Sequence, residues 1–274
     1  MNFCEQEPFL EIRGLSKRYE QRRAFTRAKF TIQAAEDVNL RIRRGANFAL
    51  VGESGAGKST VVRCLALIET PTTGEIWLEG VDLLTLGRKA LLPVRRQIQI
   101  IFQDPASALN PGLTAREIIA EPLVIHGQGT KQERRQRALA WMEKVGLPAK
   151  WEGKRPLEFS GGQRQRLAIA RALVLEPKLL ILDEAFSGLD LANQQTILRL
   201  LADMQAMHSL TCLHVSHDLR MVADLTDEVA VMHRGKIVEC GRTSELVTRP
   251  EHPYTRDLLD AMPSLESICL ERST

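Results

Sequence analysis

Residues 52–60, GESGAGKST, decide how the rest of this sequence is interpreted. They fit the pattern G-x-x-x-x-G-K-[ST], in which glycines let backbone N–H groups turn inward around phosphates. The apolar run before the loop, residues 48–51, predicts a buried strand. After the loop, Val61, Leu65 and Ile68 recur at the spacing of one helical face, which the following proline ends. A strand, a glycine-rich turn and a helix start together predict nucleotide binding.

The residues of this loop are expected to hold the phosphates of a nucleotide. Lys58 is expected to reach the β- and γ-phosphates, and Ser59 is expected to ligate Mg²⁺. The positive end of the following helix should add to the attraction. The predicted nucleotide-binding residues here are Gly52, Glu53, Ser54, Gly55, Ala56, Gly57, Lys58, Ser59 and Thr60.

A second candidate site follows another apolar run, at residues 179–182. Asp183 ends that predicted strand and is placed to hold Mg²⁺, directly or through water. Glu184 is expected to be the general base that polarises the water attacking the γ-phosphate. The other interpretation is a pair of solvated acids after a strand, and the phosphate-binding loop in the same chain favours the catalytic one.

The order of patterns along the chain predicts an α/β fold. Alternating apolar positions at 9–12 and 38–42 predict strands of an antiparallel edge sheet, and residues 74–80 look like a hairpin. Residues 104–156 hold many helix formers, which predicts a helical insertion. From residue 157 strands alternate with helices, which indicates a mostly parallel sheet covered on both faces. Further predictions are strands at 98–102 and 211–215, a helix at 194–204, a hairpin of 228–232 with 236–240, and a short helix at 257–262.

Composition limits the classes of partner. The 274 residues are 44% hydrophobic and 26% charged, which is typical of a globular chain, and no apolar run reaches the length of a membrane span. A net charge of +3 does not favour nucleic acid. The basic run of Arg22, Arg23, Arg27 and Lys29 is interpreted as a solvated loop, with an acidic partner as the alternative. The five cysteines form no CxxC pair, as expected in a reducing cytosol.

A third loop gives the sequence its family likeness. Residues 158–166, EFSGGQRQR, stand just ahead of the LLILDE strand, Gln103 follows one apolar strand and His217 follows another. Together with the phosphate-binding loop, these motifs resemble the ATPase subunits of ABC transporters, over about residues 9–262. The SGGQ element is the most specific of them, since other P-loop ATPases lack it.

The resemblance implies a P-loop NTPase (RecA-like) core with a mostly parallel sheet, an antiparallel β edge subdomain and an inserted helical subdomain. The implied divisions are a core of residues 9–103 and 157–245, a helical subdomain of 104–156, and a tail of 246–274 that contains the HPYT-type segment. ATP and Mg²⁺ are the implied ligands.

The same resemblance explains why one chain carries two phosphate loops. In ABC ATPases two nucleotide-binding domains pack head to tail, so the SGGQ loop of one touches the ATP held by the other. The residues implied for the partner's ATP are Ser160, Gly161, Gly162, Gln163 and Asp190. A serine and two glycines at a predicted helix start can present N–H groups to an anion.

Other roles are implied position by position. Gln103 resembles the residue that senses Mg²⁺ and water and relays to the membrane subunits, and His217 resembles the switch histidine at the γ-phosphate. Tyr19 resembles the aromatic that stacks on adenine, with a place in the core as the alternative. The implied catalytic set is Glu184, His217 and Lys58, and the implied Mg²⁺ set is Ser59, Gln103 and Asp183. The histidines at 208, 214 and 217 are not expected to bind metal, because i and i+3 in a strand face opposite sides.

Two stretches indicate a branch of the family. Residues 100–123 and 251–263 resemble the same regions of oligopeptide, dipeptide and nickel importers, and FSGGQRQRLAIARAL also occurs in the second ATPase of dipeptide importers. The implied function is an ATP-hydrolysing subunit of a peptide importer, or of an importer of nickel or another small solute. The implied partners are a second ATPase subunit, equal or different, two permease subunits and an external binding protein. The implied location is peripheral, on the cytoplasmic face of the inner (plasma) membrane.

Three departures and two further alternatives accompany this interpretation. Ala185 stands where the family most often has proline and Gly188 where it most often has alanine, and little loss of activity is expected from either. The chain stops soon after HPYT, so a cluster in a cysteine-bearing tail is not expected, since Cys269 stands alone. The alternatives are a soluble ABC ATPase acting on DNA or ribosomes, and a catalytically dead partner subunit.

Overall fold

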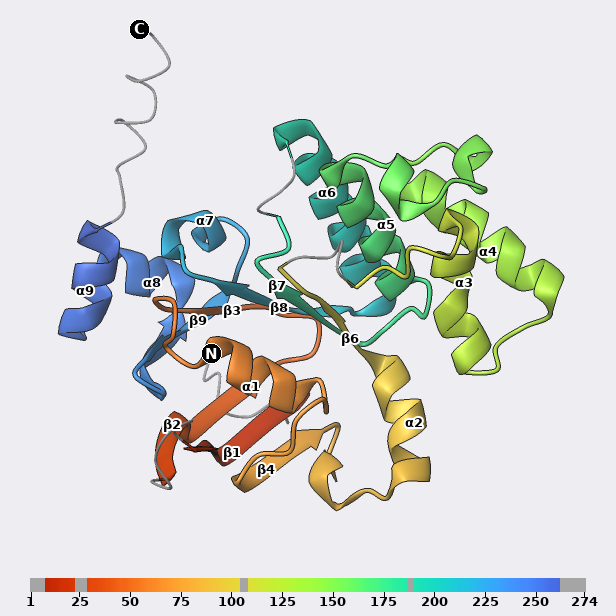
Figure 1. Ribbon diagram of the computed structural model, residues 1–274. Coiled ribbons are helices and arrows are strands. Elements are labelled where there is room, and N and C mark those ends of the chain that lie inside the picture. Colours follow the sequence, from red (N-terminus) through yellow and green to blue (C-terminus); the bar gives the residue numbers. More distant parts are fainter. Residues whose placement is uncertain (1–7, 23–28, 104–107, 187–189, 262–274) are drawn as a thin grey trace, which may run out of the picture. The chain divides into compact units, whose positions relative to one another are not determined.

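The structure is a computed structural model that describes residues 8–22, 29–103, 108–186 and 190–261. The chain divides into two compact units, one made of residues 1–84 with 214–274 and one of residues 85–213. None of the helices in the described ranges combines the length and the apolar character needed to cross a bilayer. The elements carry their labels in Figure 1.

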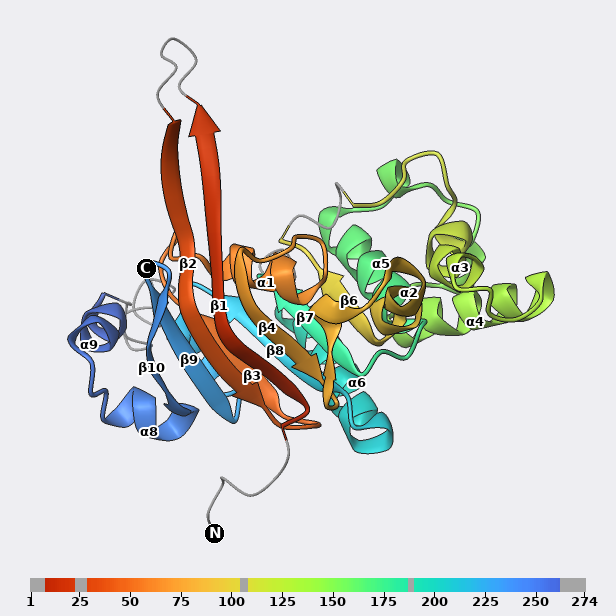
Figure 2. The ribbon, with the colours of Figure 1, turned by 90° about the horizontal axis from the view of Figure 1, so that it is seen from below.

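The first unit contains the predicted antiparallel sheet. Its strands are β1 (Leu10–Arg22), β2 (Lys29–Ile42), β4 (Thr73–Leu78) and β5 (Val81–Asp82), in the order β2-β1-β4-β5. The prediction of strands near 9–12 and 38–42 is confirmed, but both strands are much longer. Strand β1 pairs with β4 only as far as Ser16, whereas its pairing with β2 continues to Arg22. The two strands therefore run on as a two-stranded ribbon, seen in Figure 2.

Three strands of a second sheet also lie in this unit. Two of them, β3 (Asn47–Val51) and β9 (Glu228–His233), run parallel to each other. Strand β10 (Lys236–Arg242) pairs antiparallel with β9, as predicted for a hairpin. Arg234 and Gly235 connect them with φ values of 47° and 85°, as a two-residue hairpin turn with two positive φ values requires. Helices α7 (Leu219–Ala223), α8 (Thr243–Thr248) and α9 (Pro253–Asp260) contribute buried side chains to the core beside these strands.

The helix after the phosphate-binding loop is shorter than its pattern predicted. Helix α1 (Lys58–Leu65) buries Val61 and Leu65, but it ends before Ile68, which is 55% exposed. The assignment of Ile68 to the helical face was wrong. Leu67 has a φ of 55°, and a left-handed residue ends a helix because its backbone cannot continue the hydrogen-bond ladder.

The second unit combines parallel strands with helices around a large apolar core. Strand β6 (Ile98–Ile101) pairs parallel with β7 (Leu179–Asp183), and both strands were predicted. Helix α2 (Arg88–Gln97) was not predicted, because none of its residues is buried and it contains a proline, Pro93. Strand β8 (Thr211–Ser216) has its first three residues in this unit and its last three in the first unit. The main elements are α2 (Arg88–Gln97), β6 (Ile98–Ile101), α3 (Ala115–Ile125), α4 (Lys131–Lys144), α5 (Gly161–Leu173), β7 (Leu179–Asp183) and α6 (Leu191–His208).

Helices α3 and α4 start at well-formed capping boxes. Thr114 accepts from the amide of Glu117 and that carboxylate accepts from the amide of Thr114, and Thr130 and Glu133 repeat the exchange. Each box satisfies two amide groups that a helix start leaves without intrahelical partners. These helices fall within the insertion predicted at 104–156, whose exact limits as a subdomain stay a prediction.

Two isoleucines of α3 give a matched test of this packing. Ile119 is fully buried, whereas Ile125 is 59% exposed. We expect Ile119→Ala to lower the free energy of unfolding by about 2–5 kcal/mol, because it opens a cavity in the core. The same change at Ile125 should cost under about 1 kcal/mol. Chemical denaturation of both variants measures the difference, and equal losses would contradict the packing described here.

Candidate nucleotide-binding site

The phosphate-binding loop of the first unit lies against the backbones of β9 and β2. A Cβ added to Gly52 would stand 2.1 Å from the carbonyl oxygen of Met232. A Cβ on Gly57, whose φ is 106°, would stand 2.1 Å from the carbonyl oxygen of Ala34. Only glycine fits at either position, because no side chain can occupy the place of a carbonyl oxygen. The loop is therefore held backbone to backbone by two strands.

Lys58, the first residue of α1, is turned back onto this loop. Its Nζ donates to the carbonyl oxygens of Gly52 at 2.5 Å and of Glu53 at 2.9 Å. The residue is only 7% exposed, so its charge is held among backbone dipoles. A phosphate oxygen in the loop would be a stronger partner for the ammonium group than these carbonyls.

The open side of the loop has groups that suit a triphosphate. Ser54, Gly55 and Ser59 are exposed, whereas Ala56 and Thr60 are buried. Helix α1 begins at this turn, and the positive end of a helix favours an anion there. The hydroxyl of Ser59 is the kind of hard oxygen ligand that Mg²⁺ prefers. The residues present thus fit a phosphate group and its metal ion.

Tyr19, the predicted adenine platform, lies on β1 near the end of the loop. Its hydroxyl donates to Glu69 Oε2 at 2.5 Å, and Lys17 Nζ lies 5.2 Å from the ring centroid. Partial burial is the main cause that raises the pKa of Tyr19, and the bond to Glu69 adds to it. The ring is half-buried and keeps one orientation through the bond to Glu69. Its stacking on adenine stays a prediction.

The predicted carboxylate site lies in the second unit, where β7 ends. Asp183 is the last residue of the strand, and Glu184 follows with a left-handed backbone, φ 50°. Gln103, which follows β6, donates from Nε2 to Glu184 Oε2 at 2.5 Å. Since β6 and β7 are parallel neighbours, their carboxyl ends bring these side chains together. Ala185, one of the departures from the family pattern, is buried directly after the pair.

The SGGQ loop starts α5, as predicted. Ser160 is the N-cap residue, and its Oγ accepts from the amide of Gln163 at 3.3 Å. Gln163 Oε1 in turn accepts from the amide of Ser160 at 3.0 Å, which completes a capping box. Around Gly161 there is open space where a Cβ would stand. Ser160 and Gln163 thus have a role within their own chain, and their contact with a partner's ATP stays a prediction.

Asp190 stands at the start of a helix, and His217 stands after the end of a strand. Asp190 is the N-cap of α6 and accepts from the amide of Asn193 at 2.9 Å, the largest cause of its lowered pKa. His217 comes directly after β8 and is exposed, whereas His214 within the strand is buried, which lowers its pKa to about 4. Gly188 and Cys269 lie outside the described residues, as do Arg23 and Arg27.

Comparison with protein families finds two matches along this chain. The ABC transporter family matches residues 35–187, and the oligopeptide/dipeptide transporter C-terminal region matches residues 238–269. The chain belongs to the ABC transporter family. It is therefore an ATP-binding cassette with ATPase activity, as its motifs predicted.

Three relatives of this cassette show the extent of the likeness. A Brucella ovis peptide import ATP-binding protein is 44% identical over 259 residues, 94% of this chain and 80% of that protein. The dipeptide transport ATP-binding protein DppF of Escherichia coli is 42% identical over 95% of this chain and 78% of its own. The oligopeptide transport ATP-binding protein AppF of Bacillus subtilis is 41% identical over 96% of this chain and 80% of its own.

Solved structures of cassettes confirm the predicted fold class. A dimeric post-hydrolysis state of the ATP-binding cassette MJ0796 with ADP and Pi matches with a TM-score of 0.77 and 29% identity, covering 85% of this chain and 98% of that one. CbiO1 of Clostridium perfringens, part of the CbiONQ transporter complex, matches with a TM-score of 0.74 and 28% identity, covering 98% of this chain and 100% of that one. The fold is that of a P-loop NTPase with mixed sheets.

One residue of the cassette's first unit was missed from the sequence. Tyr254, in the HPYT stretch, meets the phosphate-binding loop at Glu53. The two residues are 201 positions apart, and no periodic pattern links them. Only the motif itself, an aromatic in a family-specific tail segment, could have drawn attention to it.

Gly57→Ala should weaken nucleotide binding by the cassette. The added methyl group would collide with the carbonyl of Ala34, so the loop would have to leave β2. We expect ATP affinity to fall about tenfold or more, measured by titration calorimetry. Gly45→Ala is the control, because Gly45 also has a positive φ, 71°, but open space around its Cβ position. Equal ATP affinity in the two variants would show that the close approach of Gly57 to β2 does not matter for nucleotide binding.

Proposed function

We propose that this cassette energises the import of oligopeptides or dipeptides. The observation that carries the proposal is the pair of matches on one chain, an ABC transporter cassette followed by the C-terminal region of oligopeptide/dipeptide transporters. The names of the relatives in Brucella ovis, Escherichia coli and Bacillus subtilis support the same substrate class. Nickel or another small solute is the alternative cargo.

We propose roles for the chain's own residues in ATP hydrolysis. Lys58 binds the phosphates, and Glu184 accepts the proton of the attacking water, held in place by Gln103 at 2.5 Å. Ser59 and Asp183 offer the oxygen ligands that would hold Mg²⁺, which shields phosphate charge when it is bound. The left-handed backbone of Glu184 sets this carboxylate apart from Asp183 beside it.

Glu184→Gln tests the general base. An amide at this position can still accept the bond from Gln103, but it cannot take a proton. We expect kcat to fall about 100-fold or more while ATP still binds and the dimeric form accumulates. Single-turnover hydrolysis and size-exclusion chromatography with ATP measure both effects. Wild-type turnover in this variant would remove Glu184 from the mechanism.

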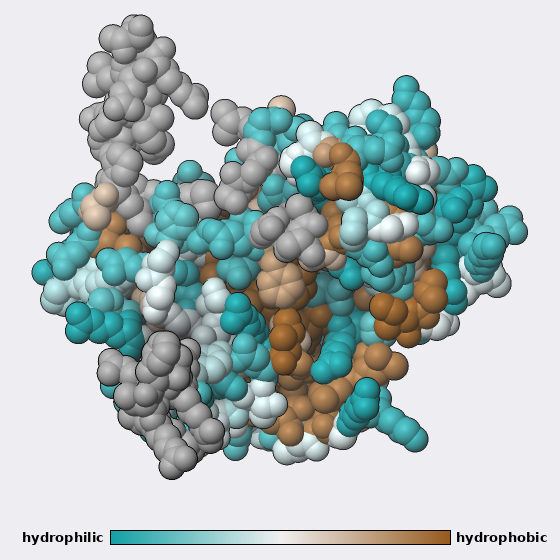
Figure 3. Space-filling view, viewed as in Figure 1, coloured by the Kyte–Doolittle hydropathy of each residue, from teal (hydrophilic) through white to brown (hydrophobic). Residues whose placement is uncertain are grey.

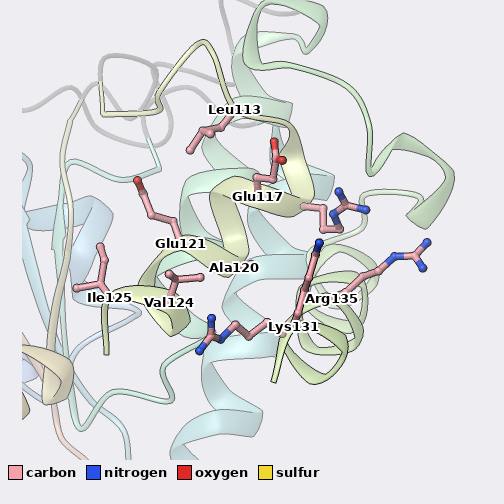
Figure 4. Close-up of a pocket in the computed structure, with 10 residues that line it drawn as sticks. Leu113, Glu117, Ala120, Glu121, Val124, Ile125, Lys131 and Arg135 are labelled. Carbon is pink, nitrogen blue, oxygen red and sulfur yellow. The ribbon is translucent and has the colours of Figure 1, made fainter. Parts of the chain in front are cut away.

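The proposed membrane partner needs a docking surface, and a pocket beside α3 and α4 offers one. It has a volume of about 630 Å³, and its apolar wall includes Val124 and Ile125, which are 56% and 59% exposed. Apolar side chains come to the surface over α3, among hydrophilic neighbours (Figure 3). Figure 4 shows these residues on one side and Lys131 projecting from α4 on the other.

Charges on the rim of the pocket indicate the chemistry of the partner. Arg116 and Arg135 share one acid, Glu152, at 3.3 and 2.7 Å. Lys131 makes no ion pair with any residue in the described ranges. The lining residues include four cations and two acids, which are Arg116, Lys131, Arg134 and Arg135 against Glu117 and Glu121. The rim is therefore positive, and we propose that it receives an amphipathic permease segment with an acidic side chain.

The whole proposal is tested on the membrane-extracted complex, isolated through this chain. Its ATP hydrolysis is measured with and without short peptides on the binding protein, and peptides should raise the rate severalfold. Stimulation by nickel or another small solute alone would keep the motor role and refute peptide import. A chain that is isolated alone, and hydrolyses ATP whatever the solute, would refute the transporter assignment.

The same isolation tests docking at the cytoplasmic face of the membrane. Less permease should be recovered with the Ile125→Ala and Lys131→Glu variants than with the wild-type chain. The first removes an apolar contact, and the second reverses a charge on the rim. Lys150→Glu is the control, because Lys150 does not line the pocket. Equal recovery from all variants would contradict this docking surface.

A further inference from the structure

Tyr254 of α9 binds the phosphate-binding loop at one peptide unit. Its Oη accepts a hydrogen bond from the backbone N–H of Glu53 at 3.1 Å. That N–H belongs to the same peptide unit as the carbonyl of Gly52, which accepts from Lys58 Nζ at 2.5 Å. A tyrosine therefore holds one end of this peptide and a lysine holds the other.

The ring of Tyr254 is itself fixed in the first unit. It lies on the ring of His233, with 3.8 Å between the centroids and 36° between the planes. His233 ends β9 and follows Met232, whose carbonyl occupies the place of a side chain on Gly52. The same strand end thus supports both the loop and the tyrosine that binds it.

The start of α9 is bound to β10 as well. The carboxylate of Glu239 accepts from the amides of Glu251 at 2.9 Å and His252 at 3.1 Å. His252 Nδ1 then accepts from the amide of Tyr254 at 3.2 Å and caps the helix. These bonds fix the backbone that carries the tyrosine.

The phenol of Tyr254 remains protonated under ordinary conditions. Partial burial raises its pKa, and this outweighs the lowering by the bond from the Glu53 amide. A neutral hydroxyl accepts the bond from the Glu53 amide and still has a proton to donate. The contact is thus a hydrogen bond between neutral groups.

The ammonium group of Lys58 has three N–H donors, and two of them go to the carbonyls of Gly52 and Glu53. An anion in the loop is a stronger partner for Nζ than a carbonyl, so the hold of Lys58 on this peptide would weaken when nucleotide binds. The bond from Glu53 to Tyr254 does not involve Lys58 and can persist. A loop already held in one conformation loses less entropy on binding.

We propose that Tyr254 is a positioning residue for ATP binding, which keeps the Gly52–Glu53 peptide in place when a phosphate competes for Lys58. The HPYT segment then acts on the nucleotide site through the loop, in addition to packing α9 on β9. This inference rests on the cassette's ATP binding and is independent of the cargo.

Tyr254→Phe tests the proposal, because it removes the hydroxyl and keeps the ring on His233. In the full chain we expect KM and Kd for ATP to rise about 3- to 10-fold, as the loss of one hydrogen bond implies. We expect kcat to stay within about twofold, because Tyr254 touches no reacting group. Hydrogen exchange of peptides covering residues 52–57 should become faster.

Thr248→Val is the matched control, because it also deletes a hydroxyl but on α8, where Thr248 donates to the carbonyls of Ser244 and Glu245. A merely structural tyrosine would lower the melting temperature without nucleotide and leave KM and loop exchange unchanged, and that result would overturn the proposal. Equal rises of KM in both variants would overturn it too. Tyr254→Leu, which also removes the ring, should raise KM at least as far as Tyr254→Phe. Wild-type chain that binds no ATP would instead refute its assignment as a cassette.

Discussion

The carbonyl oxygen of Met232 stands where a side chain on Gly52 would have to be, and that of Ala34 stands in the same relation to Gly57. The rest of the nucleotide site depends on this exclusion. Because the two backbones approach so closely, the loop between them has one available path, which ends where α1 begins at Lys58. The position of Lys58, the exposure of Ser59 and the contact with Tyr254 all follow from that path.

Local patterns were enough to predict the elements that carry the chemistry. The strand-loop-helix around residues 52–60, the acids after β7 and the helix start at Ser160 are each encoded within about a dozen residues of sequence. Ile68 shows the limit of such patterns. Its spacing fits a helix, but the left-handed residue before it ends the ladder, and periodicity carries no information on a single φ value.

Features that depend on distant parts of the chain could not be predicted from local patterns. Gln103 and Glu184 meet because β6 and β7 are neighbours, and strand order is not visible in either segment. The bond of Tyr254 to Glu53 depends likewise on the path of α9 past β9. Helix α2 escaped for another reason, since a helix that buries no side chain leaves no apolar period in the sequence.

The composition of the first unit from both ends of the chain also bears on its synthesis. Residues 85–213 form one continuous segment, whereas the phosphate-binding loop needs β9 and α9, which are made much later. Contacts between such distant segments close slowly, and domains complete by local contacts fold earlier on the ribosome. The second unit can thus fold before the strand and the helix that support the loop have been made. The contact between this loop and Tyr254 can form only after α9 has been made.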